Sequence, residues 1–409
     1  MTKLPTAVLR ARPRYGILAV VLLQGAIFLK AAVRSDGSPF DFATVWRASR
    51  HWLSRQPVYD DVLSAYPPSS AMLHAPLSLF PLKIAGEVQI GLCVLSLAIA
   101  LWFALRFYDW TTTSYFFSLL ALLMLNTPAV NTAIGLGNDG CILTLLVVYF
   151  FTLVKKNEYS RAALLLGVML ALKPLSIALL LIFVITRRWR GLLLALLVPL
   201  TLNLIALAWF RHPGEVFTLA GRLAAGTTFP SSLVMFNSSF VQLGRAHGFP
   251  AGFVIFSRLL ISVLALWAAW LAWKRDVPMS LRSVESASLV MVGSFLASPV
   301  LEFHHFLLLL LFVVGSTQAA SLVRNPLVTI GLFVVASNNF VPGASLGERL
   351  AIQNNVGGVL VVVGSLASLI HGRWRQSLGG APTLPVAAIR RGRMEGSTPP
   401  NEQTNTVVT

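Results

Sequence analysis

Residues 162–186 read AALLLGVMLALKPLSIALLLIFVIT, an apolar run with a lysine and a proline near its centre. A run of this length can cross a bilayer, since a spanning helix needs about 20 apolar residues. The basic stretches KKNEYSR (155–161) and RRWR (187–190) flank it on both sides. Because basic residues collect in cytoplasmic loops, both ends are expected on the same face of the membrane. Lys173 and Pro174 therefore predict a hairpin of two short helices, with Lys173 at its tip facing a protein cavity.

The whole chain shares this apolar character. Of its 409 residues, 56% are hydrophobic and only 11% are charged, against about 25% charged in ordinary soluble domains. The formal charge of +17 comes from short basic clusters between apolar runs, which argues against nucleic acid as a partner. Cys93 and Cys141 lie inside apolar runs, so no structural disulfide is expected. The composition predicts an all-α fold, a polytopic helical bundle integral to the membrane.

The basic clusters also predict a topology. The N-terminal cluster places that end in the cytoplasm, ahead of an uncleaved first span. Ten crossings plus the hairpin are expected, at about 15–33, 84–106, 114–127, 139–154, 191–209, 253–273, 286–300, 303–323, 325–341 and 355–371. Residues 1–375 would form one transmembrane domain with outer loops at 34–83 and 210–252, and 376–409 a disordered cytoplasmic tail.

In this topology, unusual polar residues gather on the outer face. They include Asp41, Asn138, Asp139, Lys173, Glu302, His304 and His305. Ionisable groups at membrane depth are costly and by default mark a functional site.

Asp41 begins a stretch with helical periodicity. One face of this stretch is apolar, formed by Phe42, Val45, Trp46, Ser49, Trp52 and Leu53, while Arg47, Arg50, His51 and Ser54 fall opposite. The pattern predicts an interfacial amphipathic helix. Asp41 could cap this helix through its carboxylate, or it could act as a base at the membrane surface.

The other candidates also have structural interpretations. Lys173 could reach the interface, pair with a carboxylate or bind a lipid phosphate. His304 and His305 could be structural, transfer a proton or contact phosphate; no metal site is expected, because adjacent histidines on a helix point in different directions. Asp139 could cap the helix that follows it. The stretch YPPSSAMLHAPLSLFPL (66–82) predicts an extended, proline-braced approach to the next span.

Motifs of soluble nucleotide-using enzymes are missing from the sequence. It contains no P-loop, no G-x-G-x-x-G after a strand and no G-x-S-x-G elbow. No cofactor is therefore expected, and a donor substrate would be carried by a lipid.

Several blocks in order resemble glycosyltransferase family 87, among the polytopic GT-C glycosyltransferases that include polyprenyl-phosphate-mannose-dependent mannosyltransferases. These blocks are DFATVWRASRHWLSRQPVYD (41–60), residues 66–82, GLGNDGCILTLLVVYFF (135–151), LLLGVMLALKPLSIALLL (164–181) and SPVLEFHHFLLLLL (298–311). The chain departs from the family at Val45, where tyrosine is frequent, and at residues 137–140, where a GQ-x-N pattern is frequent.

The resemblance implies an inverting hexosyltransferase of the plasma membrane with its site on the extracytoplasmic face. The sugar, mannose or another hexose or pentose, would pass from a polyprenyl-phosphate donor to a lipid or glycan acceptor, with membrane lipids around the protein. Asp41 would be the general base. The substrate-binding residues would be Trp46, Asn138, Lys173, Glu302, His304 and His305. A lipid or sugar transporter and a noncatalytic assembly protein remain alternatives.

Overall fold

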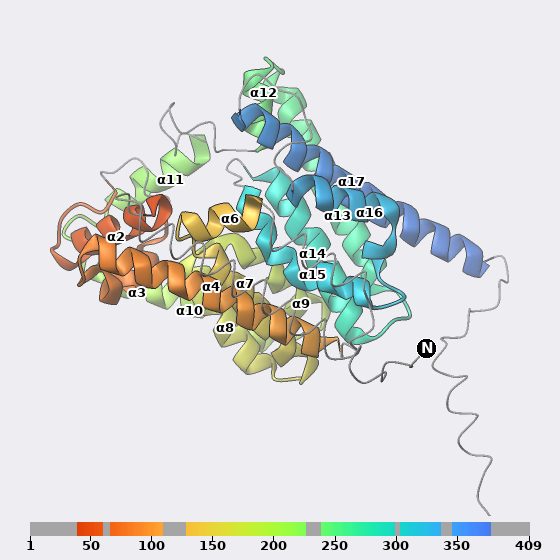
Figure 1. Cartoon of the computed structure of the whole chain (residues 1–409), viewed down its shortest axis with the longest axis horizontal. Coiled ribbons are helices and arrows are strands. Elements are labelled where there is room, and N and C mark those ends of the chain that lie inside the picture. Colours follow the sequence, from red (N-terminus) through yellow and green to blue (C-terminus); the bar gives the residue numbers. More distant parts are fainter. Residues whose placement is uncertain are drawn as a thin grey trace, which may run out of the picture.

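The computed structural model describes residues 39–59, 66–108, 128–225, 239–298, 303–336 and 346–377. Its regular elements in these ranges are all helical (Figure 1). The α-helices are α2 (Phe40–Leu53), α3 (Pro68–Ser78), α4 (Leu82–Phe107), α6 (Pro128–Gly135), α7 (Gly140–Lys155), α8 (Tyr159–Leu172), α9 (Leu180–Ile185), α10 (Trp189–Ala208), α11 (Glu215–Ala225), α12 (Phe240–Ala246), α13 (Ala251–Trp273), α14 (Met279–Ala297), α15 (Leu310–Val314), α16 (Pro326–Ala336) and α17 (Leu346–Ser377). The 3₁₀ helices are η1 (Pro174–Leu179), η3 (Phe303–Leu309), η4 (Gly315–Thr317) and η5 (Leu322–Arg324).

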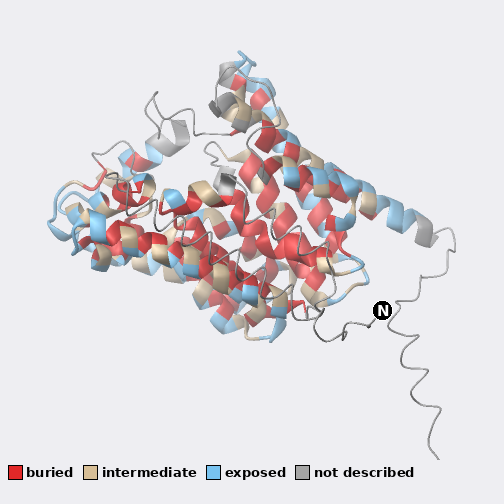
Figure 2. Cartoon of the chain, in the orientation of Figure 1, coloured by how far each residue is buried: buried red, intermediate tan, exposed pale blue. Residues whose placement is uncertain are grey.

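The helices pack in two groups that follow the chain. In the first, α2 packs on α3, α4 on α7, and α8 on α10, while in the second α13 packs on α14 and α16 on α17 (Figure 1). Helix α14 also contacts α7 and η1, which joins the groups. Buried residues run through the centre of this bundle (Figure 2). The predicted all-helical class is confirmed for the described residues.

Four helical segments are long and apolar enough to cross a membrane, namely α4, α10, α13 and residues 352–374 of α17. Only 17% of the apolar window of α10 is buried within the protein, as expected for a helix that contacts lipid on most sides. Other predicted crossings correspond to shorter helices, such as α7 with 16 residues and α16 with 11. The predicted spans at 15–33 and 114–127 lie outside the described residues, as does the tail beyond 377. A count of ten crossings therefore stays a prediction.

The break predicted near Lys173 is present. Helix α8 ends at Leu172, and Lys173 adopts an extended conformation with φ −157° and ψ 121° before η1 begins at Pro174. Proline lacks an N–H and disfavours the helical conformation in the residue before it, which explains the position of the break. The second half is not one short helix as predicted, because η1 precedes α9. The predicted crossing at 303–323 is also divided, into η3, α15, η4 and η5.

The prediction of an extended approach at residues 66–82 is wrong for most of that stretch. Residues 68–78 form α3, with Pro68 in the first helical turn and Pro76 inside the helix. A proline at the first helical position loses no hydrogen bond, because that N–H has no partner within the helix, and its φ is already helical. Helix α3 packs against α2, α8 and α10. It thereby connects the segment after Asp41 with the helix break.

Candidate functional site

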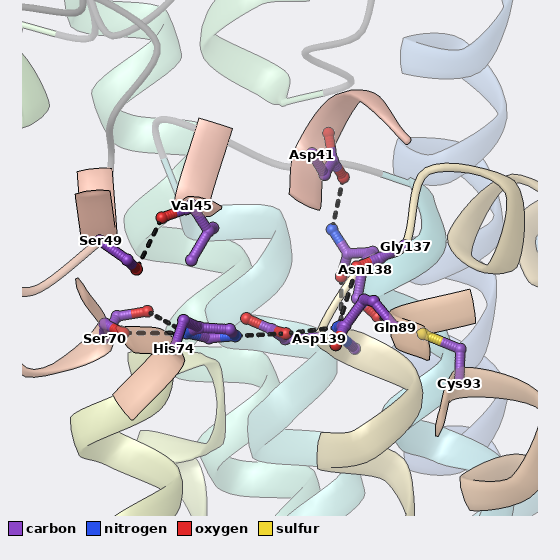
Figure 3. A network of polar contacts seen from close by, with 11 residues as sticks. Asp41, Val45, Ser49, Ser70, His74, Gln89, Cys93, Gly137, Asn138 and Asp139 are labelled. Atoms are coloured by element: carbon purple, nitrogen blue, oxygen red, sulfur yellow. Dashed lines mark hydrogen bonds and ion pairs between the residues drawn. The ribbon is translucent and has the colours of Figure 1, made fainter. Parts of the chain in front are cut away.

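Helix α2 presents Asp41 toward the interior of the first helix group. Its buried face includes Phe42, Val45 and Ser49, as the amphipathic pattern predicted, whereas Leu53 is exposed and not part of that face. The N-cap residue is Pro39, and Asp41 lies in the first turn. Asp41 is therefore not at the cap position. Its carboxylate oxygen Oδ2 accepts a hydrogen bond of 2.6 Å from Nδ2 of Asn138 (Figure 3).

The turn between α6 and α7 packs directly against the start of α2. The N–H of Phe42 donates to the carbonyl of Leu136 at 3.2 Å. Gly137 has φ +64°, and a Cβ atom there would lie 3.0 Å from Cβ of Phe42 and 3.1 Å from Cβ of Pro39. Both the left-handed backbone and this close approach favour glycine. Gly137 thus allows the turn to reach Asp41.

Both polar atoms of the Asn138 side chain have protein partners. Nδ2 donates to Asp41, and Oδ1 accepts from the N–H of Gly140 at 2.8 Å. The side chain is buried, with 1% exposure. These contacts favour a role in holding Asp41 over the direct substrate contact expected from the sequence.

Asp139 is the N-cap residue of α7, but its side chain makes no capping hydrogen bond. The capping interpretation is therefore wrong, because the carboxylate turns to other donors. Its Oδ1 accepts from Nε2 of His74 at 3.1 Å and from Nε2 of Gln89 at 3.0 Å (Figure 3). Nε2 of Gln89 also donates to the carbonyl of Gly137 at 3.1 Å. Helices α3 and α4 thus both donate hydrogen bonds to the turn.

His74 and Asp139 form a buried ion pair. Nδ1 of His74 lies 2.9 Å from the carbonyl oxygen of Ser70, so both ring nitrogens face acceptors. With a proton on each nitrogen, the ring is a cation that donates to both oxygens. Burial by itself lowers the pKa of His74, but Asp139 outweighs it and the pKa is raised. Burial likewise raises the pKa of Asp139, but His74, Lys173 and Gln89 outweigh it and the pKa is lowered.

Lys173 lies at the helix break, on the side of this ion pair. Its charge contributes to lowering the pKa of Asp139, and its Nζ lies 5.2 Å from the ring centroid of Tyr66. The backbone at the break is tied to α3, since Oγ of Ser69 donates to the carbonyl of Ala171 at 2.5 Å. The break therefore faces other protein elements, as expected for a broken helix at membrane depth.

Trp46 connects α2 to the junction of α3 and α4. Its Nε1 donates to the carbonyl of Phe80 at 3.1 Å, and the guanidinium of Arg50 lies 5.3 Å from the ring centroid. The indole is half-buried. Its N–H and one ring face are therefore engaged within the protein.

The C-terminal candidates are placed only in part. Glu302 and the side chain of His304 lie outside the described residues. His305 is buried on η3, with its ring centroid 6.2 Å from that of Phe295 on α14. Because η3 packs against α6 and α7, which flank the Asn138–Asp139 turn, this segment adjoins the site.

Sequence reasoning missed His74 and Gln89. A histidine inside an apolar stretch and a glutamine inside the predicted span 84–106 were the available signals, since polar groups in such segments need partners. Within the described ranges, no group of three or more His, Cys, Asp or Glu side chains is arranged to hold a metal ion.

The geometry is that of a helical membrane protein with an anchored carboxylate and a neighbouring cation. Residues 65–299, more than half of the chain, match glycosyltransferase family 87. The chain belongs to this family, which confirms the resemblance seen in the sequence and makes the protein a glycosyltransferase.

Curated relatives agree with this membership. An alpha-(1→3)-arabinofuranosyltransferase of Mycobacterium tuberculosis is 28% identical over 305 residues, covering 72% of this chain and 69% of that protein. Proteins with the same name are 27% identical in Mycolicibacterium smegmatis, over 70% of this chain and 68% of the relative, and 24% identical in Corynebacterium glutamicum, over 90% of each. No solved structure matches the chain.

Proposed function

We propose that this protein transfers a sugar from a polyprenyl-phosphate donor to a hydroxyl group of a lipid or glycan acceptor, with Asp41 as general base. The observation that carries the proposal is the 2.6 Å hydrogen bond from Asn138 to Asp41. This bond joins two blocks of the chain that the sequence had separately marked as functional. It orients the carboxylate that is proposed as the base.

The chemistry is a single displacement. Asp41 takes the proton from the acceptor hydroxyl as its oxygen attacks the anomeric carbon, and the bond from that carbon to the lipid phosphate breaks. Attack opposite to the leaving phosphate inverts the anomeric configuration. General-base assistance of this kind contributes roughly 10²- to 10⁴-fold to a rate.

Lys173 is the described residue best suited to the leaving phosphate. It lies half-buried at the break between α8 and η1. Its charge acts on Asp139, the neighbour in the chain of Asn138, which bonds to Asp41. A fixed cation stabilises the charge that develops as the phosphate leaves. Glu302, His304 and His305 belong to the same proposed substrate-binding set, because η3 adjoins the turn. Trp46 would offer its remaining ring face to sugar or lipid.

Among the sugars expected from the sequence, which were mannose or another hexose or pentose, the relatives favour a pentose. All three are named for transfer of arabinofuranose in alpha-(1→3) linkage. If this chain makes the same linkage by inversion, its donor carries the sugar in the beta configuration. The site would face the outside of the plasma membrane, where a lipid-linked donor is available without nucleotide.

The test is transfer of labelled sugar by the purified protein in proteoliposomes. Donors would be synthetic polyprenyl phosphates carrying beta-arabinofuranose, beta-mannose or beta-glucose, with acceptor lipids and glycans extracted from envelope membranes. We expect arabinofuranosyl transfer that requires Asp41. Glu158→Gln is the matched control, since this carboxylate pairs with Arg161 at the end predicted to be cytoplasmic. Folded protein that transfers from none of these donors would contradict the proposal.

A further inference from the structure

Helix α3 contacts residues that neighbour both groups on which the proposed reaction depends, Asp41 and Lys173. Ser69, near its start, donates to the carbonyl of Ala171, two residues before Lys173. His74, five residues further along the helix, bonds to Asp139, which follows Asn138 in the chain. The same serine also binds the helix to α10, because Oδ1 of Asn203 accepts from the N–H of Ser69 at 3.1 Å. The segments that carry the proposed base and the proposed cation are thus both positioned by one short helix.

The contacts around Asn138 clamp the chain on both sides of it. Gln89 donates from one nitrogen to the carbonyl of Gly137 and to the carboxylate of Asp139. His74 adds a charge-assisted bond to the same carboxylate oxygen. The backbone carbonyl of Asn138 itself accepts from Sγ of Cys93 at 3.5 Å. Asn138 therefore has little freedom to move its amide relative to Asp41.

A buried ion pair is a costly way to hold a turn. Removing two charges from water is unfavourable, and apolar packing often stabilises a fold as well or better. Here the pair leaves Oδ2 of Asp139 and Oε1 of Gln89 buried, with no hydrogen-bond partner among the described residues.

We propose that His74 and Asp139 are positioning residues for Asp41: their ion pair fixes the turn at 137–139, and through it the Asn138 amide that orients the Asp41 carboxylate. The inference deepens the proposed function and rests on it. It assigns to α3, through His74, a share in the rate of transfer although His74 does not touch Asp41.

The first test compares two single substitutions with their combination in the transfer assay. Asp139→Asn keeps the shape of the side chain and removes its charge, and Asn138→Ala removes the bond to Asp41. We expect each to lower kcat about 10-fold, with the acceptor KM within about twofold of wild type. Both substitutions act on Asp41 through the same contacts. The kcat of Asn138→Ala/Asp139→Asn should therefore be no lower than that of the less active single variant. Losses that multiply would overturn the proposal.

A second variant separates positioning from folding. His74→Gln/Asp139→Asn removes both buried charges while leaving groups that can hydrogen-bond, so the penalty of an unpaired charge disappears. We expect this variant to fold and to keep the lowered kcat. A return to the wild-type kcat would show that the pair only supports the fold. Glu285→Gln, which changes a buried carboxylate on α14 that pairs with Arg275, is the control expected to keep kcat.

Carbodiimide labelling of Asp41, quantified by mass spectrometry at one mildly acidic pH, gives a readout that needs no transfer. The reagent reacts more readily with carboxyl groups that are not held by a hydrogen-bond donor. We expect labelling to rise in both Asn138→Ala and Asp139→Asn, and not in Glu285→Gln, because the hydrogen bond from the Asn138 side chain holds the Asp41 carboxylate in place. Unchanged labelling in Asp139→Asn overturns the proposal. A rise in labelling together with wild-type protein that lacks Asp41-dependent transfer supports the positioning role and contradicts the proposed function.

Discussion

Two buried acidic residues, one in each helix group, show how differently an ion pair can be used. Glu285 on α14 is bonded by Arg275 through Oε2 and accepts the N–H of Leu322 through Oε1, so both oxygens are satisfied. Asp139 receives His74 and Gln89 on a single oxygen, while its second oxygen has no hydrogen-bond partner among the described residues. The first arrangement joins α14 to η5. The second holds a turn beside Asp41.

The largest expected difference concerns the removal of each cation. His74→Ala leaves a fully buried carboxylate without its positive partner and should cost about 3–5 kcal/mol of unfolding free energy. Arg275→Ala should cost less, because Arg275 is 22% exposed and Glu285 keeps the N–H of Leu322. Unfolding in detergent measures both. Equal losses of unfolding free energy would show that the two ion pairs contribute equally to stability.

Lys173 should affect catalysis more than stability. Lys173→Met keeps the length of the side chain but removes the charge proposed to face the leaving phosphate, and we expect kcat to fall about 10- to 100-fold. Lys155→Met is the matched control. Lys155 is the last residue of α7, at the end away from Asp139, and its Nζ donates to the carbonyl of Phe107 at the end of α4. Steady-state transfer with both variants checks this. A control as slow as Lys173→Met would contradict the role of Lys173.

Substitutions of Gly137 and Gly248 should have smaller effects, and they separate backbone strain from close packing. Both have positive φ, but a Cβ at Gly137 would approach α2, whereas nothing lies within 4 Å of one at Gly248. We expect Gly137→Ala to cost about 1–3 kcal/mol and to slow transfer, because the turn must shift away from Asp41. Gly248→Ala should show the backbone strain alone, with normal transfer. Thermal unfolding and kcat distinguish the two effects.

The smallest effect is a dependence of stability on pH. The pKa of His74 is raised above its usual 6.5, so its contribution is complete below that pH and is lost as pH rises through the raised value. The pKa of Asp139 is lowered from 3.8, so its contribution is present above 3.8 and is lost only at lower pH. The charged or titratable groups around the pair are Lys173, from the break after α8, and Cys93, from α4.

We therefore expect wild type to exceed His74→Gln/Asp139→Asn in unfolding free energy by the largest amount between pH 3.8 and pH 6.5. The difference should shrink as the pH rises through the raised pKa of His74. Unfolding measured across this range would show it. An advantage that grows with rising alkalinity would contradict a cationic His74.

The sequence predicted much of the site because its signals were local. Lys173 followed by Pro174 marked the helix break, and the apolar periodicity after Asp41 marked α2. Polar residues in apolar surroundings singled out Asn138 as well, and the structure brings it to Asp41. Each of these features depends on neighbouring residues in the chain.

What the sequence did not predict depends on contacts between distant segments. The prolines at 67 and 68 suggested an extended chain, yet Pro68 begins α3, because helix formation there is supported by packing against α2, α8 and α10. The partner of Asp139 lies 65 residues away on that helix. No local pattern distinguishes a capping aspartate from one that pairs with a remote histidine.

The most direct test of the central claim compares wild type with Asp41→Asn in the proteoliposome transfer assay. The substitution keeps the shape of the side chain and removes the base. The account predicts that wild type transfers arabinofuranose and that Asp41→Asn loses roughly 10²- to 10⁴-fold in rate, with unfolding unchanged and Glu158→Gln fully active. Transfer at the wild-type rate by folded Asp41→Asn would contradict the assignment of Asp41 as the base.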